Sequence, residues 1–197
     1  MTRGNAHNFE NSRHSKTMER KIIWSIITQY ICFFFVCSCT GFLWEVLIFL
    51  VKDGEFCKRG FLYGPWLPIY GIGGVLFHLI LRKRKDHPMQ IFLLSMLLGT
   101  GVELLAGWFL DKVWHLRYWD YSRNLLNLHG YICLYSVIGF GIAGVLWVCL
   151  FSKLTLKMWI HIPPRIRNVI VTLLVAAFLF DCAASLIYPN IGDGITF

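Results

Sequence analysis

Three acidic side chains lie inside long apolar runs of the sequence, at Glu45, Glu103 and Asp181. Ionisable groups inside a membrane are costly unless they are paired or hydrated, and they usually mark a polar pathway or a binding site. Each acid follows a small residue by four positions, which places the two on one face of a helix; the small residues are Gly41, Gly99 and Ala177. Two interpretations follow: structural carboxylates that lock helices together, or one polar cavity that opens outward and is shared by all three acids.

The runs that hold these acids are long enough to cross a membrane. The chain is 56% hydrophobic and only 15% charged, whereas soluble domains are about 25% charged. Five runs approach or exceed the ~20 residues that span a hydrocarbon layer, and they lack the alternation of membrane strands. The sequence therefore predicts an all-α integral membrane protein with five transmembrane helices, at residues 22–51, 62–81, 90–110, 131–151 and 169–187.

The formal net charge of +8 reports the orientation of these helices. Thirteen of the 19 Lys and Arg residues lie before the first run, between the second and third, or between the fourth and fifth. Because cytoplasmic loops carry the Lys/Arg excess, we expect the N-terminus inside and the C-terminus outside. The basic residues thus need no nucleic-acid partner. Residues 1–20 are polar and predict a disordered cytoplasmic tail, and residues 21–197 a single five-helix membrane domain.

Two stretches of the chain resemble each other. "RGFLYGPWLPIYGIGGVLF" (59–77) matches "HGYICLYSVIGFGIAGVLW" (129–147) at an offset of seventy, and the preceding runs match at fifty-eight, aligning Gly41 with Gly99 and Glu45 with Glu103. The simplest account is a duplicated two-helix hairpin, with helices 1–2 and 3–4 a parallel internal repeat. The alternative is a chance likeness between glycine-rich apolar helices. If the hairpin is duplicated, the second copy has about twelve extra residues in its outer loop, near "WHLRYWDYSRNL".

Polar and aromatic residues near the outer ends of the helices are candidates for substrate binding. In "GPWLPIYGIGG" two prolines break the helical hydrogen bonds, so this segment is either a loop that dips toward the acids or the first turns of a helix. "RYWDYS" either closes over a cavity or forms an interfacial aromatic belt. Arg59, Arg117 and Arg123 are candidate partners of the acids. The predicted binding residues are Glu45, Glu103, Asp181, Trp66, Tyr70, Arg117, Trp119, Asp120, Tyr121 and Arg123.

Several kinds of site have no sequence signal. The chain lacks HExxH, paired His/Cys ligand spacing, a Ser–His motif and GxxxxGK[ST]. We therefore expect no metal, no cofactor and no P-loop in this chain, and assign no catalytic residue. Cys57 and Cys133 both fall near the outer face and could pair, although spacing alone does not decide a disulfide.

The segments "GFLYGPWLPIYGIGG" and "WDYS" followed by Gly130, together with Glu103, resemble the CmpB family of bacterial membrane proteins, described as ABC-transporter permeases. The resemblance covers roughly residues 41–147, and the family has relatives among small vertebrate transmembrane proteins. It implies a multi-pass protein of the bacterial plasma (cell) membrane that works with a separate ATPase chain. Residues 153–167 are the segment that could contact such a chain.

Three functions fit these observations. The first is a permease-like transport component for a small polar, cationic or lipid substrate; five helices make a small pore wall, so it implies a homodimer or partner chain besides membrane lipids. The second is an intramembrane enzyme that acts on a lipid or isoprenoid, with paired acids as general acid and base. The third is a non-catalytic accessory subunit whose acids pair with a partner helix.

Overall fold

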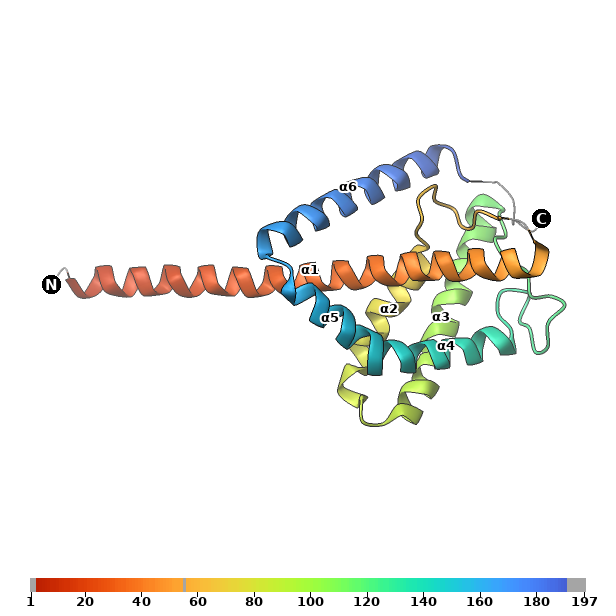
Figure 1. Ribbon diagram of the computed structural model, residues 1–197, viewed down its shortest axis with the longest axis horizontal. Coiled ribbons are helices and arrows are strands. Elements are labelled where there is room, and N and C mark those ends of the chain that lie inside the picture. Colours follow the sequence, from red (N-terminus) through yellow and green to blue (C-terminus); the bar gives the residue numbers. More distant parts are fainter. Residues whose placement is uncertain (1–2, 55, 191–197) are drawn as a thin grey trace.

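The computed structural model describes residues 3–54 and 56–190, with side chains described from Ser15 onward except that of Asp53. The described chain is helical (Figure 1). A 3-10 turn, η1 (Arg82–Arg84), follows the second helix, and a π-helical segment, η2 (Trp147–Phe151), joins the fourth helix to the fifth without a break. The α-helices are α1 (Arg3–Asp53), α2 (Pro68–Leu81), α3 (Pro88–Trp114), α4 (Leu134–Leu146), α5 (Ser152–His161) and α6 (Pro164–Ile187).

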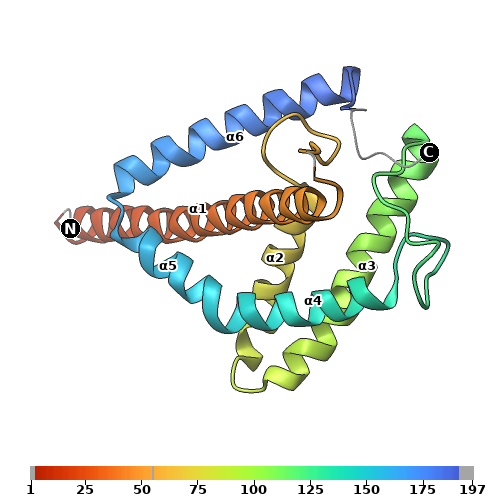
Figure 2. The ribbon, with the colours of Figure 1, turned by 45° about the vertical axis from the view of Figure 1, so that its right-hand side comes forward.

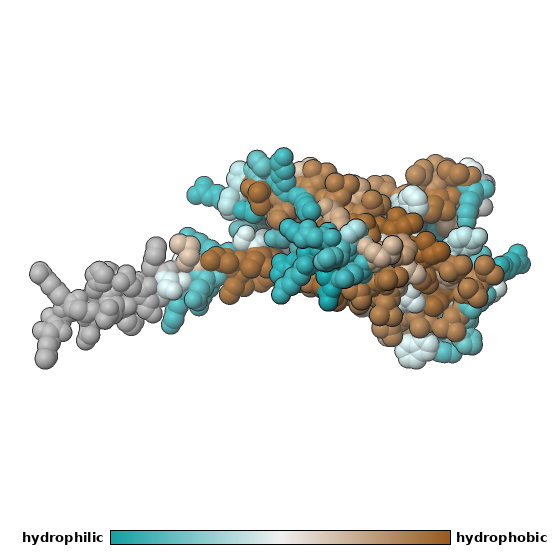
Figure 3. All heavy atoms as spheres, turned by 90° about the horizontal axis from the view of Figure 1, so that it is seen from below, coloured by the Kyte–Doolittle hydropathy of each residue, from teal (hydrophilic) through white to brown (hydrophobic). Residues whose placement is uncertain are grey.

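Within the described residues, four helical stretches are long and apolar enough to cross a membrane, as expected of a helical membrane protein. Figure 3 shows apolar surface over much of the face seen from below, with hydrophilic patches at its middle, at its right-hand edge and toward the projecting part of α1. Four of the five expected spans are thus confirmed in position. The stretches are Ser15–Lys52, Pro88–Trp114, Leu134–His161 and Pro164–Ile187.

The second expected span differs from the prediction. The helix begins at Pro68 rather than near Leu62, and its 14 residues reach only about 21 Å at ~1.5 Å per residue, less than a ~30 Å hydrocarbon layer. Proline at the first helical position lacks the N–H that would continue the helix backward. The residue before it, Leu67, is extended with φ −111° and ψ 103°, as a following proline favours. Residues 59–67 therefore form a loop, followed by a short helix.

The polar amino-terminal segment is described from Arg3 onward, as part of the first helix. Helix α1 continues back to Arg3 and is 51 residues long, about 77 Å at ~1.5 Å per residue. Its first part projects past the other helices (Figures 1 and 2). Extending an existing helix is far easier than nucleating one, so the apolar span propagates α1 into the polar segment.

Helix α1 packs against α2, and α3 against α4, through small residues. At several glycines an added Cβ would lie under 2.5 Å from a facing side-chain atom, a closeness that small residues permit between membrane helices. The contacts of the two pairs occur at the offsets of fifty-eight and seventy seen in the sequence. They are Gly41 on Tyr70 and Gly74 on Cys37 in the first pair, and Gly99 on Phe140 and Gly144 on Ser95 in the second.

The loops that the sequence predicts on the outer side of the membrane, here called outer loops, are joined by hydrogen bonds at Asn190, just after α6. Its backbone N–H donates to Phe61 O (3.2 Å), and its side-chain amide donates to Gly60 O (2.9 Å). The hydroxyl of Tyr118 donates to Asn190 O at 2.8 Å. The loops at residues 54–67 and 115–133 therefore meet the end of α6, opposite the projecting part of α1 (Figure 1).

The close packing of α4 on α3 predicts different effects of one substitution at two glycines of α4. A Cβ at Gly144 would lie 1.9 Å from Ser95 Oγ, whereas one at Gly139 meets nothing within 4 Å. Gly144→Ala should lower the free energy of unfolding by about 1–3 kcal/mol through overpacking. Gly139→Ala should leave it unchanged or raise it by up to ~1 kcal/mol through helix propensity. Unfolding of both variants in lipid–detergent micelles checks this, and equal effects would contradict the packing.

Candidate functional site

Glu45 on α1 is a paired carboxylate. Its Oε2 accepts a hydrogen bond from Arg59 Nε at 3.1 Å, and its Oε1 accepts one from the Tyr70 hydroxyl at 3.0 Å. The Arg59 side chain is buried, donates to Tyr118 O, and lies 4.3 Å from the centroid of the Phe49 ring. Glu45 therefore ties α1 to α2 and, through Arg59, to the outer loop at residues 115–133.

Glu103 on α3 is satisfied less completely. The residue is 6% exposed, its Oε1 accepts a hydrogen bond from the Tyr121 hydroxyl at 3.3 Å, and its Oε2 is buried without a hydrogen-bond partner. The Ser136 side chain of α4 lies near enough to the carboxylate to influence it electrostatically. Its hydroxyl, however, donates to Cys133 O (3.0 Å) and accepts from Cys133 N (3.1 Å).

The ion pairs of the described residues leave Glu103 without a cation. They join Arg59 to Glu45, and Arg117 to Asp111 and Asp120. A buried carboxylate that lacks both a counter-ion and a full set of donors is costly in an apolar setting. Within the described part of the chain, Glu103 therefore lacks a counter-ion and a hydrogen-bond donor to its Oε2 atom.

The two glutamates belong to one cluster with two tyrosines, here called the Glu45–Glu103 cluster. Glu45 and Glu103 lie close enough to interact electrostatically with each other and with both phenols, Tyr70 and Tyr121. The four side chains come from α1, α3, α2 and the outer loop at residues 115–133. With Arg59 included, the cluster holds one positive side chain against two carboxylates.

Asp181 on α6 has a different set of partners. Its carboxylate accepts hydrogen bonds from the backbone N–H groups of Tyr63 (2.9 Å) and Gly64 (2.7 Å), and from Trp66 Nε1 (2.7 Å). The Ser185 hydroxyl donates to it at 3.3 Å. These bonds satisfy N–H donors of the loop at residues 59–67. Irregular backbone within a membrane requires such hydrogen-bond partners. Among the described residues, Asp181 shares no hydrogen-bond partner with Glu45 or Glu103.

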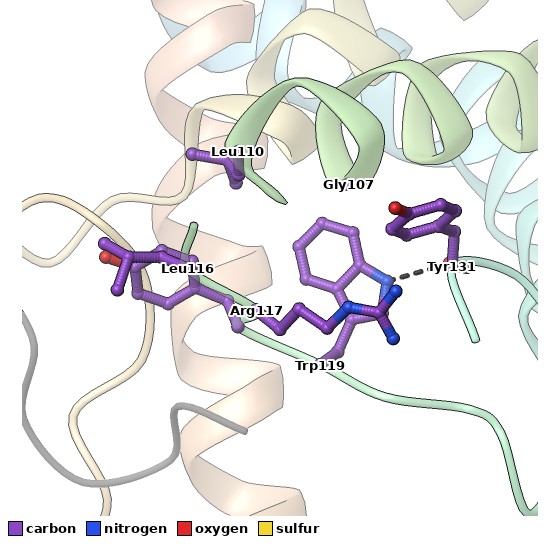
Figure 4. A pocket seen from close by; sticks show the side chains of 7 residues that line it. Gly107, Leu110, Leu116, Arg117, Trp119 and Tyr131 are labelled. Carbon is purple, nitrogen blue, oxygen red and sulfur yellow. Dashed lines mark hydrogen bonds between the residues drawn. The ribbon is translucent and has the colours of Figure 1, made fainter. Parts of the chain in front are cut away.

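Arg117 and Trp119 fix the outer loop over the end of α3. Arg117 pairs with Asp111 at 3.3 Å and with Asp120 at 3.8 Å, and its guanidinium lies 4.8 Å from the centre of the Tyr131 ring. Trp119 Nε1 donates to Tyr131 O at 2.8 Å (Figure 4). The cavity between these side chains has a volume of only about 10 Å³, room for roughly one water. This part of the loop is packed rather than hollow.

The turn at Asp120 directs Tyr121 toward Glu103. The Asp120 carboxylate accepts hydrogen bonds from the hydroxyl and the backbone N–H (2.9 Å) of Ser122, and these hold the pKa of Asp120 below its ordinary value. The backbone N–H of Tyr121 donates to Gly130 O at 2.9 Å. Burial, together with the charge of Glu103, raises the pKa of the Tyr121 phenol, so this hydroxyl keeps its proton and donates it.

The ten predicted binding residues fall into three groups. Glu45, Glu103, Tyr70 and Tyr121 gather in the cluster, Asp181 and Trp66 meet at the loop of residues 59–67, and Arg117, Trp119 and Asp120 organise the outer loop, while Arg123 is exposed. Sequence reasoning named Arg59 as one of three arginine candidates but did not choose it. It gave no role to the polar groups of Tyr118, Tyr131 and Asn190, because their partners are distant in the chain.

Two further expectations concern other kinds of site. Within the described residues, Cys57 and Cys133 are both buried and are not joined by a disulfide. In the same part of the chain, no three His, Cys, Asp or Glu side chains gather as metal ligands would.

Comparison with known families gives one match. The family model described as "Putative ABC-transporter type IV", ABC_trans_CmpB, matches residues 32–186. Comparison with curated proteins gives no match, and comparison with solved structures gives none. The matched range contains all three acids, both loops that supply their partners, and α2 to α5.

The bonds to Asp181 predict a local effect of Asp181→Asn. An amide in place of the carboxylate keeps one acceptor oxygen and turns an NH₂ group toward donors, so the loop loses charge-assisted hydrogen bonds. Amide hydrogen exchange at Tyr63 and Gly64 should become about 10-fold faster or more, because such bonds contribute roughly 1.5–3 kcal/mol each. Exchange over residues 119–131 serves as the internal control. Unchanged exchange at Tyr63 and Gly64 would show that Asp181 does not hold this loop.

Proposed function

The chain belongs to the ABC_trans_CmpB family of ABC-transporter type IV proteins, and from that premise we propose that it is a permease-like transport component that binds a small cationic solute at the Glu45–Glu103 cluster. The family match and the apolar helices already identify a transport-related membrane protein. The proposal adds where the solute binds and what charge it carries.

One observation carries the proposal: the Oε2 atom of Glu103 is buried and has no hydrogen-bond partner. Glu45 already accepts hydrogen bonds from Arg59 and Tyr70, whereas Glu103 accepts a long hydrogen bond from the Tyr121 hydroxyl, at 3.3 Å. Two carboxylates and one guanidinium leave the cluster short of one positive charge. A cationic solute supplies that charge, and its N–H groups or aqueous shell supply the missing donors.

Duplication of a two-helix hairpin accounts for the difference between the two acids, and we include it in the proposal. The paired glycine contacts support it, since both pairs pack at the same offsets. At those offsets Tyr70 corresponds to Phe140, and Arg59 corresponds to His129. Phe140 has no hydroxyl to donate. The second copy would thus have lost the phenol that satisfies the acid of the first, and Glu103 became available to a ligand.

The side chains of the cluster favour an organic amine as the solute. Carboxylates form charge-assisted hydrogen bonds to ammonium groups, and the faces of tyrosine rings attract cations, quaternary ammonium ions among them. Tyr121 reaches the cluster from the outer loop, whose residues 122–129 are exposed. A movement of this loop would therefore open a path to Glu103 from the outer side.

Partners and location complete the proposal. The family assignment supports a bacterial plasma membrane and a separate ATPase chain. Helix α5 exposes Lys153, Lys157 and the apolar side chains of Met158 and Ile160, which together make a surface suited to such a chain. A homodimer would enlarge the wall around the path, because the four long helices enclose little space.

Charge movement on solid-supported membranes tests the binding site. Reconstituted wild-type protein should give a transient current when methylammonium or choline is added, and Glu103→Gln should lower it about 10-fold or more, as expected for the loss of a charge-assisted contact of roughly 1.5–3 kcal/mol. The substitution removes a buried charge, so the protein should remain folded, which its melting temperature in detergent verifies.

The matched control is Asp86→Asn, which removes an exposed carboxylate from the turn between α2 and α3. It should leave the current unchanged. Equal currents from wild type and Glu103→Gln, at equal melting temperature, would exclude Glu103 as the cation site.

A further inference from the structure

An apolar groove runs between α1, α2 and α6, away from the Glu45–Glu103 cluster. Its volume is about 520 Å³, and apolar side chains line it from all three helices, among them Ile27, Phe34, Val75, Leu79 and Val175. In Figure 2 α6 runs alongside α1, with α2 behind and below. The helices that form the groove include two that are long and apolar enough to span a membrane, so the groove opens toward lipid.

Side-chain contacts flank the groove toward both of its ends. At the end near the start of α6, Trp24 Nε1 donates a hydrogen bond to Asn168 Oδ1 at 2.9 Å. At the other end, the rings of Phe34, Phe35 and Phe178 form edge-to-face contacts with centroids 5.3–5.7 Å apart. Trp24 and Phe34 are ten positions apart on α1, which gives a length of about 15 Å at ~1.5 Å per residue. Its length and its apolar lining make the groove a slot that suits a narrow, flexible apolar chain.

The end near Trp24 is basic. Arg167 lies one turn before Val171 and two turns before Val175, on the face of α6 that lines the groove. Its Nε atom is buried and has no hydrogen-bond partner. In the sequence, Arg20 and Lys21 lie just before Trp24, and Arg165 lies just before Arg167. The acidic residue beside them in the sequence is Glu19. The amino-terminal end of α6 adds the positive end of a helix dipole.

We propose that this groove binds one acyl chain of an anionic phospholipid from the leaflet at this basic end, with the lipid phosphate at Arg167. The slot accommodates the chain and the donors at its mouth accommodate the headgroup, so the two features select the same molecule. Basic side chains at a membrane surface attract anionic lipids by about 1 kcal/mol each. The site shares no residue with the Glu45–Glu103 cluster and does not depend on solute transport.

Native mass spectrometry of the delipidated protein tests the proposal, with phosphatidylglycerol and phosphatidylcholine of identical acyl chains as competing probes. The wild type should retain one phosphatidylglycerol per chain in preference to phosphatidylcholine. Val175→Trp fills the groove and should abolish this adduct. Leu173→Trp is the matched control, because Leu173 lies on the same helix but is 65% exposed, and it should bind as the wild type does.

A second pair of variants tests the headgroup contact. Arg167→Gln should lower the preference for phosphatidylglycerol about fivefold, the effect of one basic side chain, while Arg123→Gln in the outer loop should not change it. Leu79→Trp fills the groove from α2 and replaces Val175→Trp if that variant does not fold. Equal lipid retention by the wild type and the groove-filling variants, or equal retention of both lipids by the wild type, would overturn the proposal.

Discussion

The structure depends on the pairing of buried carboxylates with polar groups that helices do not satisfy. Asp181 accepts the N–H groups of Tyr63 and Gly64, and Glu45 accepts the guanidinium of Arg59. These bonds allow an irregular loop to exist beside membrane-spanning helices, where unsatisfied backbone would cost several kcal/mol per group. The loop in turn sets the start of α2 at Pro68 and places Tyr70 against Glu45. The requirement that buried polar groups be hydrogen-bonded thus governs both the structural acid and the acids of the candidate site.

The same constraint makes Glu103 different from the other two acids. Asp181 has four donors and Glu45 has a cation and a phenol, whereas Glu103 has one phenol from a loop and a buried oxygen without a partner. Because burial makes an unbalanced charge costly, such a group either takes up a proton or binds a ligand that supplies the missing charge. Its contact with Tyr121 couples the site to the outer loop, which Arg117 and Trp119 hold against α3 and Tyr131. Ligand access and loop position are therefore linked.

Much of the fold could be predicted because apolar length reports membrane spans directly. Prediction failed at residues 62–67, where the run is apolar but Asp181, more than a hundred positions away, supplies acceptors in place of helix bonds. The acids were found from their type and setting alone. Their partners were not resolved, since three arginines were equally plausible for Glu45 and only tertiary contacts choose Arg59.

The central claim is that a cation binds against the carboxylate of Glu103. Solid-state NMR measures this contact directly, by dipolar recoupling between ¹⁵N-methylammonium and ¹³C-labelled glutamate carboxyl groups in reconstituted membranes. The account predicts one glutamate carboxyl in close contact with the ammonium nitrogen, with a signal that disappears in Glu103→Gln. A recoupled signal that persists in that variant, or none in the wild type at saturating methylammonium, would contradict the account.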